Sequence, residues 1–82
     1  MKKKKQSDSS PIHVGELIGE VMYQQHISKH EFADRIATDR SNVYRILKKE
    51  SVETGQLWRY GKILNYNFFK DLAEWFEESK DS

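Results

Sequence analysis

Residues 27–47 of this chain read ISKHEFADRIATDRSNVYRIL and contain the start signals of two short helices. Ser28, with Glu31 three positions later, has the pattern of a capping box, which predicts a helix that begins at Lys29. The buried face of that helix is expected to contain Phe32, Ala33 and Ile36.

A second helix is expected directly after Asp39, whose side chain can accept a hydrogen bond from a free amide of the first turn. The apolar residues Val43, Ile46 and Leu47 have the i, i+3, i+4 spacing of a single helix face. Only about three residues separate the two helices, which is too few for an antiparallel pair. The segment therefore predicts a helix-turn-helix, in which the first helix supports the second across a steep crossing.

The same segment resembles the helix-turn-helix of the Cro and phage-repressor family, the Xre-like regulators. The matching residues are a small one in the first helix, Ala33, and a small one in the turn, Ala37. The apolar anchors Val43 and Ile46 in the second helix match as well. The resemblance covers about residues 12–69. It implies a lambda-repressor-like bundle in which the second helix of the pair contacts DNA.

The length and composition limit what kind of protein this chain can be. Its 82 residues suffice for one small domain. It has no cysteine, which excludes disulfides, thiolate catalysis and zinc–thiolate sites. No apolar run approaches the roughly 20 residues that cross a bilayer, and the lysines after Met1 are not followed by the apolar segment of a secretory signal. We therefore expect a soluble, cytoplasmic protein without a membrane partner.

The charge is unevenly distributed, although the net charge is only +1. Residues 2–5 are four lysines, and residues 28–49 contain six basic against three acidic side chains. Residues 71–82 contain five acidic side chains and one basic side chain. A locally positive surface can therefore exist on a nearly neutral molecule.

Residues 1–9 have no apolar side chain after Met1, so we expect them to form a disordered basic arm. Such an arm is either a solvated tail or a segment that lies along DNA phosphates, as basic arms do in some repressors that this chain resembles. The folded domain is expected at residues 10–78, followed by a flexible tail at residues 79–82.

The sequence predicts further helices on both sides of this pair. The first would have Ser10 as its N-cap and Pro11 at its first position, and it would end near His26. Its buried stripe would consist of Val14, Leu17, Ile18, Val21 and Met22. A fourth helix would be capped by Ser51 or Thr54. It would bury Leu57, Tyr60, Gly61 and Leu64.

Asn67 can cap a fifth helix after the break at Asn65. The expected buried stripe of that helix is Phe69, Leu72, Ala73 and Phe76, widened by Phe68 and Trp75. No segment shows the alternation of a strand, and no internal repeat is present. The sequence thus predicts an all-α bundle of four to five short helices.

A second helix with its aliphatic residues inside must turn its polar residues outward. Arginine can donate to two acceptors of guanine, so Arg45 is the expected base reader, and Arg40 can reach either a base or a phosphate. Ser41 and Asn42 lie near the helix start, where free amides favour phosphate, and Asn42 can also pair with adenine. The expected DNA-contacting residues are Lys29, Arg40, Ser41, Asn42, Tyr44, Arg45 and Lys48.

Three residues depart from the pattern of the family. Lys29 stands where many relatives have a glutamine that clamps the DNA backbone; it keeps a phosphate donor but loses the two-way hydrogen bonding of an amide. Ala37 stands where the family often has glycine, so a positive φ there would cost about 1 kcal/mol. Asp39 would repel phosphate unless its carboxylate serves as the N-cap.

Other side chains that could carry chemistry are weakly supported. His26 and His30 are four residues apart, as metal ligands on a helix are, but the cap at Ser28 breaks the helix between them. No glycine-rich phosphate loop, nucleophile motif or placed pair of carboxylates is present. We therefore expect no enzymatic activity, cofactor, metal or small-molecule ligand.

Large aromatic side chains crowd the last third of the chain, and they are more than so small a bundle easily buries. Some are therefore expected at a homodimer contact between the last two helices, which the family resemblance also implies. Two-fold pairing would place the DNA-contacting helices about 34 Å apart and would imply a near-palindromic operator. The expected interface residues are Phe68, Leu72, Trp75 and Phe76.

Two functions remain open on the sequence alone. The first is a sequence-specific DNA-binding transcriptional regulator of the Xre-like kind. It would repress transcription by occupying a promoter, and the sequence does not exclude that it activates transcription instead. The alternative is a protein-interaction module, such as an antitoxin, that keeps the helix-turn-helix core and holds its partner with the aromatic end. The outward face of residues 40–48 separates the two, because only the regulator needs those basic side chains for binding.

Overall fold

The computed structural model describes residues 12–80, and all regular structure in that part of the chain is helical. The helices are α1 (Val14–Gln24), α2 (Lys29–Arg35), α3 (Arg40–Leu47), α4 (Thr54–Leu64) and α5 (Phe68–Lys80). This confirms the predicted all-α bundle of short helices. The predicted basic arm at residues 1–9, the Ser10-Pro11 helix entry and residues 81–82 of the predicted tail lie outside the described residues. Within residues 12–80, no helix combines the length and the hydropathy needed to cross a bilayer.

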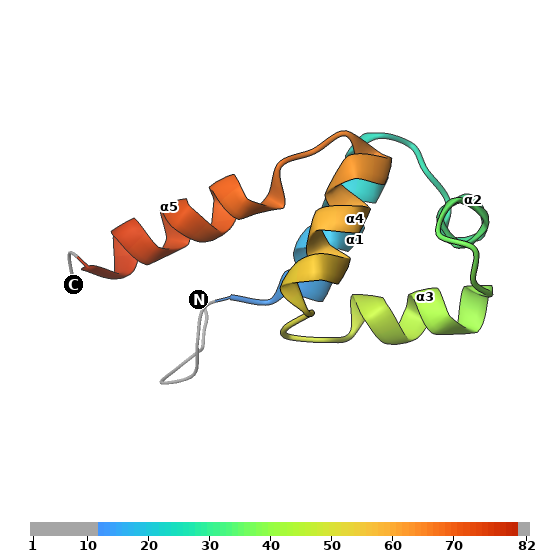
Figure 1. Cartoon of the computed structure of the whole chain (residues 1–82), viewed down its shortest axis with the longest axis horizontal. Helices are drawn as coiled ribbons and strands as arrows, with labels where there is room; N and C mark the ends of the chain where they lie inside the picture. Colours follow the sequence, from blue (N-terminus) through green and yellow to red (C-terminus); the bar gives the residue numbers. More distant parts are fainter. Residues whose placement is uncertain (1–11, 81–82) are drawn as a thin grey trace.

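The helices α1 and α4 form the centre of the molecule, and α2, α3 and α5 are arranged around them (Figure 1). The side-chain amide of Gln25, after α1, donates to the carbonyl oxygen of Leu64, the last residue of α4, at 2.8 Å. On one side of this centre, α2 points toward the viewer while α3 lies across the view, so the two helices cross steeply (Figure 1). On the other side, α5 extends away from the helix-turn-helix. The DNA-contacting pair of the prediction and the aromatic C-terminal helix therefore lie at opposite ends of the molecule.

The core takes apolar side chains from all five helices. Phe32 of α2 and Tyr60 of α4 meet edge to face, with ring centroids 5.6 Å apart. Burial raises the pKa of Tyr60, and the nearby Arg59 guanidinium opposes that shift. The buried side chains are Val14, Ile18, Val21, Met22, Phe32, Ala33, Ile36, Val43, Ile46, Leu57, Tyr60, Leu64 and Phe68.

The start of α1 differs from the prediction. The helix begins at Val14, and its N-cap is His13, whose Nδ1 accepts a hydrogen bond from the amide of Glu16 at 3.1 Å. The described helix α1 therefore begins later in the chain than the prediction placed it. A histidine is not among the residues preferred at N-caps, so the local sequence carries no signal for this start.

Tertiary hydrogen bonds add to the His13 cap at the start of α1. The amide of Val14 donates to the carbonyl oxygen of Glu50 at 3.0 Å, and the amide of Gly15 donates to that of Lys49 at 2.8 Å. Both carbonyls follow the end of α3, so they satisfy free amides of α1 from outside the helix. A Cβ atom on Gly15 would lie 2.4 Å from the carbonyl oxygen of Leu47, so only glycine fits at this close approach.

The start of α4 also differs from the prediction. Its N-cap position is Glu53, which makes no side-chain capping bond, and Thr54 is the first helical residue. Neither Ser51 nor Thr54 caps the helix. The helix is held by the core and by Arg59, whose Nη2 donates to the carbonyl oxygen of Ile36 at 2.9 Å. This bond ties α4 to the turn between α2 and α3.

The predicted ends of α1 and α4 and the predicted cap of α5 are confirmed. His26 and Asn65 have φ angles of 61° and 54°, the left-handed conformation that ends a helix. The side-chain oxygen of Asn67 accepts from the amides of Phe69 at 3.1 Å and Lys70 at 3.3 Å. Asn65 therefore ends α4, and Asn67 begins α5.

The helix α5 packs through a different face from the one predicted. Phe68 is buried, with only 1% of its surface exposed. Leu72 and Trp75, on the same side of the helix, are partly buried. The predicted buried stripe is wrong for three of its residues, which are exposed: Phe69, Ala73 and Phe76.

The orientation of α5 follows from a close contact at its start. A Cβ atom on Gly61 would lie 2.6 Å from the carbonyl oxygen of Tyr66 and 3.6 Å from the ring of Phe68. The absence of a side chain at Gly61 therefore admits the connection to α5 and the ring of Phe68. Since the helix turns about 100° per residue, placing Phe68 in the core rotates the neighbouring Phe69 outward.

Candidate nucleic-acid interface

The first helix of the pair begins as predicted, but only half of the capping box is formed. The Ser28 hydroxyl oxygen accepts from the amide of Glu31 at 3.0 Å, and α2 begins at Lys29. The Glu31 carboxylate accepts instead from the Arg35 guanidinium, one turn further along, at 2.7 Å. The start of α2 thus relies on the serine, and the glutamate neutralises a surface arginine.

The second helix of the pair also begins as predicted. A carboxylate oxygen of Asp39 accepts from the amide of Asn42 at 2.8 Å, and α3 begins at Arg40. The negative charge of Asp39 is therefore used at the positive end of the helix dipole. Val43 and Ile46 are buried, as their spacing predicts.

The turn between the two helices adopts a left-handed conformation at Ala37, with φ of 58°. The amide of Thr38 donates to the carbonyl oxygen of Ala33 at 2.9 Å, which closes the end of α2. The preceding carbonyl, that of Ile36, accepts from Arg59. The turn is thus held by one hydrogen bond from within the pair and one from α4. The positive φ of Ala37 is the strained conformation that the sequence analysis considered for this residue.

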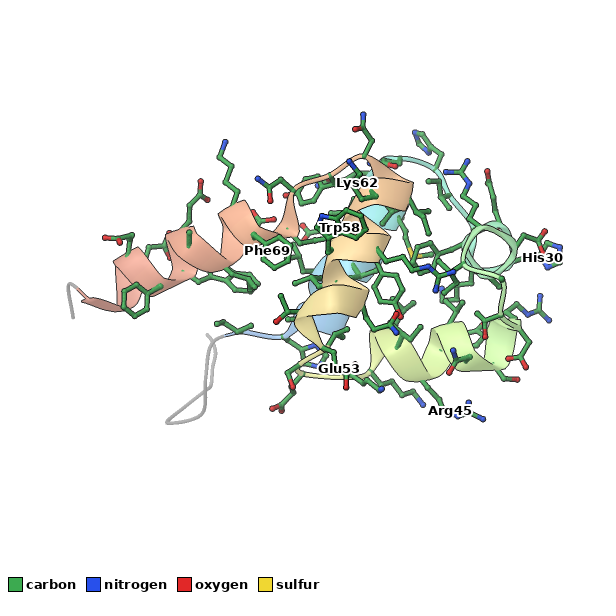
Figure 2. The ribbon with its side chains drawn as sticks, viewed as in Figure 1. His30, Arg45, Glu53, Trp58, Lys62 and Phe69 are labelled. Carbon is green, nitrogen blue, oxygen red and sulfur yellow. The ribbon has the colours of Figure 1, made fainter. Side chains whose placement is uncertain are left out.

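The outward face of α3 carries the predicted DNA-contacting side chains. Arg40, Ser41, Tyr44, Arg45 and Lys48 are exposed, while Lys29 and Asn42 are partly buried. Figure 2 shows Arg45 extending from α3 away from the rest of the molecule. The ion pairs His30–Asp34 and Arg35–Glu31 both lie on α2, and among the residues whose side chains are described no carboxylate pairs with a basic side chain of α3.

A chain of hydrogen bonds joins the turn to Arg45. The hydroxyl oxygen of Thr38 accepts from the side-chain amide nitrogen of Asn42 at 3.1 Å. The side-chain oxygen of Asn42 accepts from Nη1 of Arg45 at 3.4 Å. Both ends of the Asn42 amide are therefore engaged, which favours a role in orienting Arg45 over pairing with adenine. The sequence analysis missed Thr38, whose only signal is its i, i+4 spacing to Asn42.

A cation–π contact connects the two helices at the surface. The Nζ atom of Lys29 lies 5.4 Å from the centre of the Tyr44 ring. An uncharged amide side chain at this position could not make this cation–π contact, and the lysine also places an ammonium group beside the outward face of α3.

The exposed surface of α2 is electrically balanced, in contrast to that of α3. His30 lies 3.8 Å from Asp34, and Arg35 is paired with Glu31. His26 lies in the turn before α2, as predicted, and is thus not on one helix with His30. Within the described part of the chain, no three His, Cys, Asp or Glu side chains are grouped to hold a metal ion.

The predicted interface residues of α5 differ in how far they are exposed. Phe68 is buried in the core of its own chain, so it is not available to a partner; this corrects its assignment to the interface. Leu72 and Trp75 are partly buried, and only Phe76 is largely exposed, at 63%. Sequence reasoning missed Trp58 of α4, which is 59% exposed.

Comparison with known proteins identifies no relative. The chain matches no protein-family model, no curated protein and no solved structure. Any functional conclusion therefore depends on the residues and their geometry.

Proposed function

We propose that this chain is a sequence-specific DNA-binding transcriptional regulator of the kind its sequence resembles, acting as a homodimer with α3 in the major groove. The observation that supports this best is the outward face of α3, where Arg40 and Arg45 are exposed and have no carboxylate partner among the described residues. A surface arginine that forms no ion pair is available to contact phosphate or a base.

The dimensions of α3 suit this role. It is a regular α-helix of eight residues, and the diameter of an α-helix with its side chains, about 10–12 Å, fits the roughly 12 Å width of the major groove of B-DNA. Arg45 lies in the middle of the outward face, and Asn42 restrains its guanidinium group. In this proposal Arg45 donates to two acceptors of guanine, a pairing that discriminates against the wrong base by about 1–3 kcal/mol.

The residues around Arg45 are suited to holding the DNA backbone. Lys29 on one side and Lys48 on the other can neutralise phosphates, and the hydroxyl groups of Ser41 and Tyr44 can donate to phosphate oxygens. These contacts would fix the position of α3 along the groove, while Arg45 supplies the choice of sequence. Occupation of a promoter would then repress transcription, with no catalytic step and no cofactor.

The test is a salt series of binding to a random-sequence duplex, measured by fluorescence polarisation. The chain should bind with a steep dependence on salt, because each neutralised phosphate releases a counterion. Arg40→Ala/Arg45→Ala should weaken binding and reduce the slope of log K against log salt by about 1–2. A matched control, Arg35→Ala/Lys62→Ala, removes the same charge from α2 and α4 and should keep most of the binding.

Two results would overturn the proposal. One is the absence of salt-dependent binding in the wild-type chain. The other is an equal loss of affinity in the α3 variant and in its matched control, because binding would then reflect net charge alone. Each would favour the alternative function, a protein-interaction module such as an antitoxin. That alternative is supported by the exposed aromatic side chains Trp58 and Phe76.

A further inference from the structure

A hollow lies between α4, the start of α5 and the connection that joins them. Its volume is about 420 Å³, within the range of about 300–1,000 Å³ that is usual for small-molecule sites. The rings of Trp58 on α4 and Phe69 on α5 line it, and both are exposed, at 59% and 36%. Figure 2 shows these two side chains beside each other where α5 leaves α4. The hollow therefore offers two aromatic surfaces to a molecule from solution.

The floor of the hollow belongs to the core of the chain. Leu57 and Phe68 line it and are buried, with 3% and 1% of their surfaces exposed. Gly61 adds no side chain to the lining, and a Cβ atom there would lie 2.6 Å from a carbonyl oxygen of the connection to α5. The side-chain oxygen of Asn67 accepts from the amide of Phe69 at 3.1 Å, which holds the first turn of α5. The hollow is thus a consequence of how α4 joins α5.

The hollow has a positive charge at one place. Among the described residues that line it, Lys62 is the only charged one, and its Nζ atom lies 5.7 Å from the centre of the Trp58 ring. The ion pairs of the described side chains lie on α2 and do not include Lys62, so its ammonium group is available to a carboxylate. Tyr66 also lines the hollow, but its hydroxyl already donates to Asp71 at 2.6 Å.

This combination of rings and charge restricts the chemistry of an occupant. A cation would be repelled by Lys62, and a simple anion such as phosphate would leave both rings in contact with water. An aliphatic molecule would make no ring-to-ring contact. A small molecule that carries a carboxylate on an aromatic ring satisfies both features, because its ring can pack on Trp58 and Phe69 while its carboxylate faces Lys62.

We propose that the hollow between α4 and α5 binds a small aromatic carboxylate. The ring of the ligand lies between Trp58 and Phe69, and its carboxylate pairs with the ammonium group of Lys62. The sequence analysis expected no small-molecule ligand, because the residues of this hollow come from two helices that no local pattern places together. The inference goes beyond the proposed function, and it requires neither DNA nor a second copy of the chain.

The expected affinity is low. The hollow is open at the exposed ring of Trp58, and an ion pair at the surface contributes little to binding. For a ligand of about 13 non-hydrogen atoms, the usual contribution per atom corresponds to a dissociation constant of about 1 mM. Chemical-shift titration measures affinities in this range.

The test is a titration of the labelled chain with three probes of similar shape, followed by amide chemical shifts without DNA. Indole-3-acetate, indole-3-acetamide and tryptamine share one ring system and carry a negative charge, no charge and a positive charge. Indole-3-acetate should shift the amides of residues 57–62 and 65–69. It should bind about threefold more tightly than indole-3-acetamide and about tenfold more tightly than tryptamine.

Two variants separate the charge from the ring. Lys62→Met should weaken the binding of indole-3-acetate by about threefold and leave that of indole-3-acetamide unchanged, because only the charged contact is lost. Trp58→Ala should weaken both by about fivefold or more. The matched controls, Lys49→Met and Tyr23→Ala, remove an exposed ammonium group and an exposed ring outside the lining of the hollow. Both controls should bind the probes as the wild type does.

Three results would contradict the inference. They are the absence of saturable shifts at residues 57–69 up to about 10 mM indole-3-acetate, equally tight binding of tryptamine at the same residues, and an equal loss of affinity in the variants and their controls. The spectrum of each variant shows whether it is folded, and Lys62→Met decides the matter if Trp58→Ala is unstable. Because DNA is absent, failure here would leave DNA binding by α3 standing, and failure of the salt series would leave this site standing.

Discussion

The helices α3 and α5 are both amphipathic, and both bury one face in the same core, but their outer faces differ in chemistry. The outer face of α3 carries Arg40, Arg45 and Lys48, and that of α5 carries Phe69 and Phe76 among acidic side chains. The buried faces build the fold, and the outer faces differ in the partner that they suit. We infer that one end of the molecule is suited to DNA and the other to protein.

The two helices also differ in how firmly they are held. The helix α3 is fixed by the Asp39 cap, by the hydrogen bonds from the first turn of α1 and by the close approach of Gly15. The helix α5 is held by Phe68 and Leu72 in its first turns and by the partly buried Trp75, and its far end extends from the body (Figure 1). A firmly held helix suits the reading of fixed base edges, and a projecting helix suits docking with a partner.

The largest effect is expected at the contact that positions α3. Gly15→Ala places a methyl group 2.4 Å from the carbonyl oxygen of Leu47, so α1 and α3 must separate. We expect a loss of about 3 kcal/mol in the free energy of unfolding, measured by urea denaturation. The matched control is Gly55→Ala, where a Cβ meets nothing within 4 Å. It should be neutral or should stabilise the chain by up to about 1 kcal/mol. Equal effects at the two glycines would show that α3 is not held by this approach.

The next effect compares the two outer faces in DNA binding. Arg45→Ala should cost about 1–3 kcal/mol on a duplex selected from a random pool, and it should relax the preference at one base pair. Phe76→Ser should leave the affinity for a single half-site unchanged, because in the proposed complex α5 does not contact DNA. Competition binding with single-base variants of the half-site measures both. A loss of half-site affinity in Phe76→Ser would break the division between the two faces.

A smaller effect separates the two roles of Asp39. Asp39→Ala should lower the free energy of unfolding by about 1 kcal/mol through loss of the cap. Asp39→Asn keeps a capping oxygen but removes the charge, so it should retain stability and bind random DNA more tightly than wild type. Denaturation and polarisation on the same samples provide the check. Weaker DNA binding in Asp39→Asn would contradict the placement of this carboxylate near phosphate.

The smallest effect concerns the start of α5 and depends on pH. The hydrogen bond to Asp71 is the largest contribution that raises the pKa of Tyr66 to about 12, and burial and nearby carboxylates add to it. Because the folded-state pKa lies above the ordinary value of 10.0, the stabilisation is complete below about pH 10 and is lost as the pH rises toward about 12. In Tyr66→Phe, most of this loss of stability at high pH should disappear. A smaller loss should remain, because the pKa of Tyr60 is also raised. Denaturation from pH 8 to about 12 measures the difference; identical pH profiles would exclude the bond.

The sequence predicted the parts of the fold that depend on local signals. The caps at Ser28, Asp39 and Asn67 and the buried Val43 and Ile46 were correct, because each depends on neighbours within one or two turns. The same periodicity predicted the outward face of α3. That is why the exposure of five side chains of this face could be predicted without a structure: Arg40, Ser41, Tyr44, Arg45 and Lys48.

The errors occur where tertiary contacts outweigh local signals. The start of α1 is set by carbonyl groups that follow α3, which no pattern near Pro11 reveals. The rotation of α5 was wrong because Phe68 and Phe69 are adjacent aromatic residues and both give a plausible stripe. The close approach at Gly61, seven residues earlier, decides between them.

The central claim, that α3 contacts DNA and α5 does not, is tested most directly by amide chemical-shift mapping. Labelled protein is titrated with the duplex enriched from a random pool. We expect the largest shifts at residues 40–48 and at Lys29, with residues 69–78 unchanged at constant oligomeric state. Shifts centred on residues 69–78, or none at residues 40–48 despite binding, would contradict the account.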